Sequence, residues 1–125
     1  MEIVSTTDAP TPAGHYSQAI VHNDLVFVSG QLPVNPDTNE KIVSSIEEQT
    51  LLALNNLKAI LEEAGSAINQ VLKVTVYISD ISLWGRMNAV YNEFFQDHKP
   101  ARAVVPTKEL HFGFQIEIEA IAFRQ

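Results

Sequence analysis

A strict alternation of apolar and polar side chains over residues 72–78 limits the folds open to this chain more than any other feature. Four apolar residues interleave there with three less apolar ones: Leu72, Val74, Val76 and Ile78 with Lys73, Thr75 and Tyr77. Successive side chains of a strand point to opposite faces, so the pattern predicts a strand with one covered face and one less apolar face.

Helical patterns lie on both sides of this strand. Ser45 and Glu48 form a capping box that predicts a helix start, and Gly65 supplies the C-terminal stop. The apolar face between them has helical spacing: Ala53, Leu54, Leu57, Ile60, Leu61 and Ala64. A second helix is expected from a cap at residues 80–82 to a point before Pro100. Its predicted buried stripe is Leu83, Trp84, Met87, Val90, Tyr91, Phe94 and Phe95.

The remaining segments predict strands. Residues 17–21 and 25–29 indicate a β-hairpin with its turn at residues 22–24, and two further strands are expected within 99–105 and 115–120. The resulting order is ββ-α-β-α-ββ. It predicts an α+β fold, a two-layer sandwich in which a single mixed sheet of about six strands has two helices on one face. A length of 125 residues, 46% of them hydrophobic, fits a single domain over 1–125.

Composition excludes several functions. A net charge of −7 without any basic run argues against a nucleic-acid partner. The absence of cysteine excludes disulfides, thiolate metal sites and a cysteine nucleophile, and the four histidines lack metal-ligand spacing, so no metal site is expected. Residues 1–6 have neither the basic nor the apolar region of a signal peptide, and no segment approaches transmembrane length. A cytoplasmic protein without a membrane partner is therefore expected.

Arg102 is the residue most in need of an explanation, because it lies in an apolar segment predicted to be a strand. A guanidinium there reaches water, pairs with a carboxylate or binds an anionic ligand. Glu117 and Glu119 share one face of the last strand, opposite Ile116 and Ile118. If the two strands are neighbours, Arg102 can form a structural ion pair with a glutamate. Both the ion pair and the ligand site remain open on this spacing.

The second face of the sheet is the other open question, because two helices cover only one face. Depending on register, the uncovered face carries Tyr77, Val104, Ile121 and Phe123. An exposed face of this kind favours self-association. A closed homo-oligomer would bury it and would place pockets between subunits.

Short motifs spread along the chain share one resemblance. They include Ala-Pro at 9–10, Gly-His-Tyr-Ser-Gln-Ala at 14–19, Val-Ser-Gly-Gln-Leu-Pro at 28–33, Asn-Leu-Lys-Ala-Ile-Leu at 56–61, Pro-Ala-Arg at 100–102 and Glu-Ile-Glu-Ala-Ile-Ala at 117–122. In combination, over about residues 6–124, the chain resembles the RidA/YjgF family of imine and enamine deaminases. The resemblance implies a RidA-like domain of chorismate-mutase-like fold, a homotrimer with sites in the clefts between subunits, and no cofactor.

The resemblance also implies an activity, the hydrolysis of 2-iminobutanoate and 2-iminopropanoate to 2-oxo acids and ammonia. The family's carboxylate-binding arginine corresponds to Arg102, which would hold the substrate carboxylate through two parallel hydrogen bonds. The catalytic positions correspond to Glu117, which would position water or move protons, and to Tyr16. The other substrate-binding positions correspond to Ser29, Gly30, Asn88 and Val104.

Two positions depart from the family pattern. Val104 replaces a cysteine common among deaminating members, and His111 replaces a common proline. The resemblance implies that both positions line or border the cleft. We expect Val104 to narrow and dry the cleft and to favour imines with small apolar side chains, and we expect His111 to be exposed in a turn. Two other functions stay open: a trimer that binds small carboxylates as a sensor without turnover, and an RNA-cleaving translation inhibitor, against which the acidic balance weighs.

Overall fold

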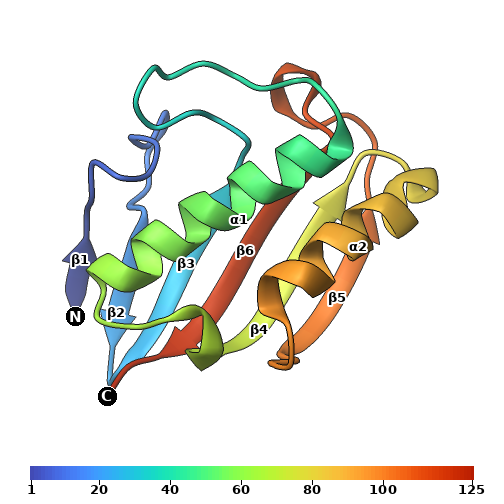
Figure 1. The fold of residues 1–125 in the computed structure, drawn as a ribbon. Coiled ribbons are helices and arrows are strands. Elements are labelled where there is room, and N and C mark those ends of the chain that lie inside the picture. The colour runs from blue at the N-terminus through green and yellow to red at the C-terminus, as the bar shows by residue number, and fades with distance from the viewer.

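The computed structural model describes all 125 residues and has the expected two-layer α+β architecture (Figure 1). The strands are β1 (Glu2–Val4), β2 (Ala19–His22), β3 (Leu25–Gln31), β4 (Val71–Ile78), β5 (Ala101–Pro106) and β6 (Ile116–Phe123). The helices are α1 (Ile46–Glu63) and α2 (Trp84–Phe95), with short 3-10 turns η1 (Ile68–Gln70), η2 (Ile81–Leu83) and η3 (His111–Gly113).

The six strands form one sheet in the order β1-β2-β3-β6-β4-β5. The sheet is mixed because β4 and β5 pair in parallel, whereas the other neighbours are antiparallel. Figure 1 shows α1 and α2 side by side across one face of this sheet. The short β1 was not located by the sequence analysis, and it completes the six strands. None of the helices has the length and apolar character needed to cross a membrane.

The predicted local signals of α1 and the hairpin are confirmed. The Ser45 hydroxyl accepts a hydrogen bond from the Glu48 backbone N–H at 3.2 Å, and Gly65 follows the helix with φ of +83°. The hairpin turn places Asn23 and Asp24 at positive φ. The buried side of α1 packs on the sheet through the predicted stripe: Ala53, Leu54, Leu57, Ile60 and Leu61.

The second helix differs from its prediction. Asp80 caps η2 rather than α2, because its carboxylate accepts a hydrogen bond from the Ser82 N–H at 2.8 Å. Of the predicted stripe on α2, the structure buries Met87, Tyr91 and Phe95. The remaining apolar side chains of the stripe stay partly or largely accessible: Leu83, Trp84, Val90 and Phe94.

The alternation predicted in β4 holds for Val74, Val76 and Ile78, which are fully buried, and fails at its first residue. Leu72 is 44% exposed, and Val71 is buried in its place. The cause is a register shift between Val71 and Lys73 where β4 pairs with β6. A single extra residue in a strand moves the preceding side chain to the other face.

The face of the sheet away from the helices, here called the open face, carries a set of partly or largely exposed apolar side chains: Leu25, Phe27, Tyr77, Val105, Ile121 and Phe123. Val104, one of the candidates for this face, lies on the other side. Its register partner Val76 is fully buried beneath the helices, and Val104 packs against the same core.

Candidate functional site

Arg102 extends from β5 on the helix side of the sheet and is held there by α2. Its Nη1 donates a hydrogen bond to the Asn88 side-chain oxygen at 2.8 Å. Its guanidinium carbon lies 4.6 Å from the ring centre of Tyr91 and 5.8 Å from that of Trp84. None of the salt bridges in the structure includes Arg102. The guanidinium is therefore oriented by neutral groups and has no carboxylate partner.

The sequence places these three partners on one face of α2. Trp84, Asn88 and Tyr91 are separated by four and three residues, the spacing that brings helical side chains together. The hydrogen bond that Asn88 accepts from Arg102 explains why an asparagine, which has a low helix propensity, occurs within α2. Desolvation raises the pKa of Tyr91 to about 12, partly opposed by the Arg102 charge, so the phenol stays neutral and offers its ring face to the cation.

Arg102 also lines a cavity of about 460 Å³ at the edge of the sheet. Tyr91, Phe95, His98 and Pro100 contribute to its wall. Because β5 pairs only with β4, its other edge is free to meet another molecule. The cavity is large enough for a small organic acid.

Glu117 lies on the open face of β6, against the backbone of Gly30 in β3. A Cβ atom on Gly30 would collide with the Glu117 carboxylate, so glycine is what allows this close approach. Desolvation raises the pKa of Glu117; the charge of His111 opposes this rise and that of Glu119 adds to it. The neighbouring Ser29 hydroxyl donates to the Ser17 carbonyl at 2.6 Å.

Tyr16 lies on the loop before β2 and is half exposed. Its hydroxyl accepts a hydrogen bond from the Ala13 N–H at 3.4 Å. Tyr16 and Gly30 line one pocket of about 120 Å³ together with Lys41 and Phe112. The Lys41 ammonium lies 4.6 Å from the Phe112 ring centre. The pocket thus adjoins the position where Gly30 meets the Glu117 carboxylate.

The predicted site residues therefore form two groups. We call the first the arginine group: Asn88, Arg102 and Val104. We call the second the glutamate group: Tyr16, Ser29, Gly30 and Glu117. One chain does not bring the two groups together, because Arg102 lies on the helix side of the sheet and Glu117 lies on the open face.

The prediction of a structural ion pair between Arg102 and a glutamate of the last strand is wrong. Strand β4 separates β5 from β6, so the two strands are not neighbours. Arg102 is paired in register with buried Val74, whereas Glu117 is paired with Tyr77 on the open face. The alternation of side chains along β4 therefore directs the two charges away from each other.

Two contributors were not predicted in their present role. Trp84 and Tyr91 were assigned to the core stripe, although their spacing around Asn88 was a usable signal. His111 is exposed, as expected, and its charge acts on Glu117. The resemblance to the RidA/YjgF family had already implied that position 111 lines or borders the cleft. No group of three or more His, Cys, Asp or Glu side chains is placed to hold a metal ion.

The single mixed sheet with its helical layer defines a protein of the YjgF/chorismate-mutase-like fold class. A family model described as "Endoribonuclease L-PSP" matches residues 6–124. A RutC family protein of Pyrococcus abyssi is 47% identical, with 99% of this chain and 98% of that protein covered. The YjgF gene product of E. coli superimposes with a TM-score of 0.95 at 37% identity, and E. coli TdcF, solved with bound serine, with 0.95 at 38%, each covering 100% of both chains. The chain belongs to the YjgF/RidA family.

Proposed function

We propose that this protein is a 2-imino acid deaminase that hydrolyses 2-iminobutanoate and 2-iminopropanoate to the 2-oxo acids and ammonia. The observation that carries the proposal is the Arg102 guanidinium, oriented by Asn88 and Tyr91 and free of any carboxylate partner. Such a guanidinium suits the bidentate recognition of a planar carboxylate. The related TdcF was solved with serine, which is also a small molecule with a carboxylate.

The division of the site into two groups supports assembly into a homotrimer. A substrate held by Arg102 needs a proton-transferring group nearby, and in one chain Glu117 lies on the other side of the sheet. A second copy docked along the free edge of β5 would bring its own glutamate group to that substrate. Closed rotational symmetry would then produce equivalent sites between neighbouring copies. The apolar open face would be buried in the same assembly.

In the proposed reaction, Arg102 fixes the substrate carboxylate and thereby the adjacent C=N carbon. Water adds to that carbon, and the tetrahedral centre releases ammonia as the carbonyl forms. Glu117 orients the water and moves protons between oxygen and nitrogen, a role helped by the raised pKa that burial confers. Tyr16, Ser29 and Gly30 shape the surroundings of this carboxylate. The reaction needs no cofactor, because the imine carbon is itself electrophilic.

The side of the cleft next to Arg102 would select the substrate side chain. Val104 lies two residues further along β5, on the same face. Its branched apolar side chain favours small apolar substituents on the imine. The family resemblance is the basis for proposing the three- and four-carbon imino acids as substrates, and Val104 agrees with their small apolar side chains.

Replacement of Arg102 tests the proposal. The imine is generated in situ by a threonine dehydratase, and oxo-acid release is followed with and without the protein. We expect Arg102→Ala and Arg102→Lys to lose the acceleration, since removing a desolvated charge-assisted contact costs on the order of 2–5 kcal/mol. Arg86→Ala is the matched control, because Arg86 pairs with Glu47 at 2.7 Å outside both groups. Full turnover by a folded Arg102→Ala protein would contradict the assignment.

Two further functions are separated by measurements on the unmodified protein. Calorimetric binding of 2-oxobutanoate without any acceleration of imine hydrolysis would identify a carboxylate-binding sensor. The family description names an endoribonuclease, and salt-dependent binding and cleavage of RNA would support that role. The net charge of −7 weighs against it.

A further inference from the structure

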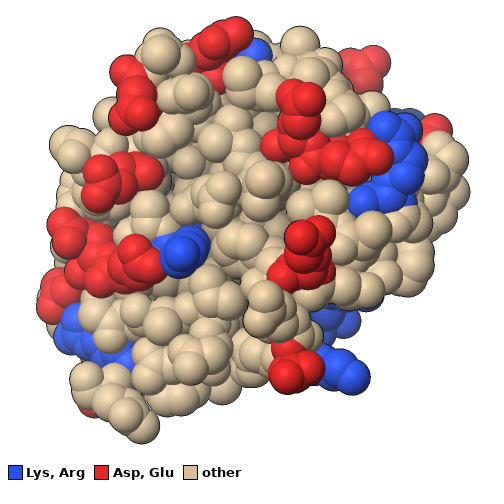
Figure 2. Space-filling model, viewed as in Figure 1, with Lys and Arg blue, Asp and Glu red and all other residues tan.

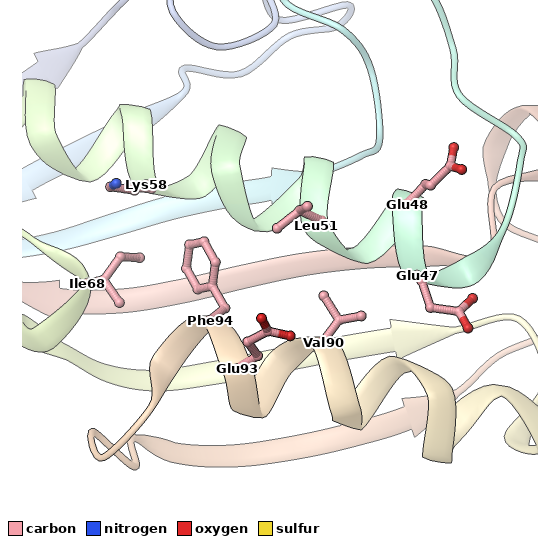
Figure 3. Close-up of a pocket in the computed structure, with 8 residues that line it drawn as sticks. All are labelled: Glu47, Glu48, Leu51, Lys58, Ile68, Val90, Glu93 and Phe94. Atoms are coloured by element: carbon pink, nitrogen blue, oxygen red, sulfur yellow. The ribbon is translucent and has the colours of Figure 1, made fainter.

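A solvent-facing groove lies between α1 and α2, on the surface of the helical layer turned away from the sheet (Figure 3). Its volume is about 580 Å³, larger than the cavity beside Arg102. No residue of the arginine group or the glutamate group lines it. The groove is therefore a separate feature, and what is inferred from it does not depend on the proposed deaminase activity.

The floor of the groove is apolar. Leu51 of α1 is 47% exposed, and Val90 and Phe94 of α2 are only partly buried. Figure 3 shows Val90 and Phe94 directed toward α1, with Ile68 of η1 beside Phe94. Val90 and Phe94 are one helical turn apart, so with Leu51 they form a continuous apolar strip along the two helices. Such a strip gains free energy when a partner covers it.

The rim of the groove has unpaired negative charge. Glu47 is paired with Arg86 through hydrogen bonds of 2.7 and 2.9 Å, which also tie α1 to α2. Lys58, the one basic residue that lines the groove, pairs with Glu62 at 3.8 Å. Glu48 and Glu93 have no basic partner. Figure 2, which shows this side of the molecule, has acidic side chains distributed over the helical layer and few basic ones. The groove therefore favours a cationic occupant.

Charge also excludes other occupants. Anionic membrane surfaces and nucleic acid would be repelled by Glu48, Glu93 and the net charge of −7. A second copy of this chain offers no suitable helix, because each of its two helices contains a single basic residue, Lys58 in α1 and Arg86 in α2. What remains is a different polypeptide that combines an apolar strip with basic flanks.

We propose that this groove docks a cationic amphipathic helix of a partner protein. Apolar residues at positions i, i+4 and i+7 of the partner would pack on Leu51, Val90 and Phe94, and flanking lysines or arginines would lie beside Glu48 and Glu93. The groove can run no further than α2, whose 12 residues extend about 18 Å, which is enough for about three turns of a partner helix.

The probe is a fluorescein-labelled helical peptide of about 18 residues, with leucine on one face and lysine on the other. Fluorescence anisotropy is measured at about 150 mM salt, where long-range attraction is screened. We expect saturable micromolar binding to the unmodified protein. Leu51→Asp and Glu93→Lys should each weaken it about tenfold or more. The matched controls, Val43→Asp and Glu63→Lys, make the same changes at exposed positions outside the groove and should bind normally.

Several outcomes would overturn the proposal. They are the absence of saturable binding, equal binding of a scrambled peptide whose leucines do not share a face, and equal weakening by Glu63→Lys and Glu93→Lys. Binding of the protein to phosphatidylglycerol vesicles through Leu51, or self-association lost in Leu51→Asp, would assign the groove to another occupant. Imine hydrolysis by Leu51→Asp and Glu93→Lys should be unchanged, so this test and the Arg102 test fail independently. Glu93 is exposed, so its replacement leaves the core intact.

Discussion

Gly30 determines where the Glu117 carboxylate lies, although it carries no functional group. The absence of a Cβ lets that carboxylate rest against the β3 backbone, at the irregular end of the pairing with β6. The Arg102 guanidinium also depends on other residues for its position, since Asn88 and Tyr91 of α2 hold it in place. At both positions the placement of the charged group is controlled by a neighbour.

Replacement of Gly30 by alanine should move the Glu117 carboxylate without unfolding the protein. The added methyl group meets only the end of a flexible side chain, which can rotate away. We expect the acceleration of imine hydrolysis to fall about tenfold or more, with the melting temperature changed by only a few degrees. Gly85→Ala is the matched control, because nothing lies within 4 Å of a Cβ placed there. Equal activity of the two variants would show that the position of Glu117 is unimportant.

Among the elements, α2 has three separate roles on its three sides. Met87 and Phe95 enter the core, Asn88 and Tyr91 hold Arg102, and the remaining side borders the groove. An amphipathic pattern alone assigns all these apolar positions to one buried stripe. The longer α1 supports this arrangement, because it packs against both the sheet and α2.

The N-terminal cap of α1 should make a measurable contribution to stability. Ser45→Ala removes the oxygen that accepts the Glu48 N–H, and the expected loss is about 1 kcal/mol of unfolding free energy, measured by urea denaturation at fixed protein concentration. The control is Ser44→Ala, in which only an exposed side-chain bond to Glu48 is lost. An equal loss in the two variants would contradict a specific capping role for Ser45.

At the level of the whole molecule, the two faces of the sheet differ in what covers them. The helices bury one face, and the open face leaves Phe27 43% exposed among other apolar side chains. The proposed trimer accounts for that surface and for the separation of the two groups in a single chain. The helical layer would then be the outer surface of the assembly, with its groove accessible.

Multi-angle light scattering tests this assembly. We expect the mass of three chains at micromolar concentration, and we expect Phe27→Asp to shift the population to single chains because a charge cannot be buried unpaired on the open face. Imine hydrolysis should be lost with the assembly, although Phe27 belongs to neither group. Leu51→Asp, an equivalent change on the helical layer, should leave the mass of three chains unchanged. A stable single chain for the unmodified protein would contradict the trimer.

Local features of the sequence determined much of this protein. The Ser45 cap, the Gly65 stop and the hairpin turn at Asn23 and Asp24 are confirmed, because each depends on residues close together in the chain. The order of helices and strands follows from periodicity for the same reason. The family motifs also identified the residues that form the two groups, although no pattern showed how those groups lie in space.

Tertiary structure alone decided which strands are neighbours and which face each residue occupies. The insertion of β4 between β5 and β6 removed the expected ion pair of Arg102, and its register with buried Val76 put Val104 beneath the helices. The shift at Val71 likewise exposed Leu72. Strand order and register depend on pairing between distant segments, and a change of one residue reverses every side chain beyond it. Local sequence patterns therefore do not predict which strands pair or in which register.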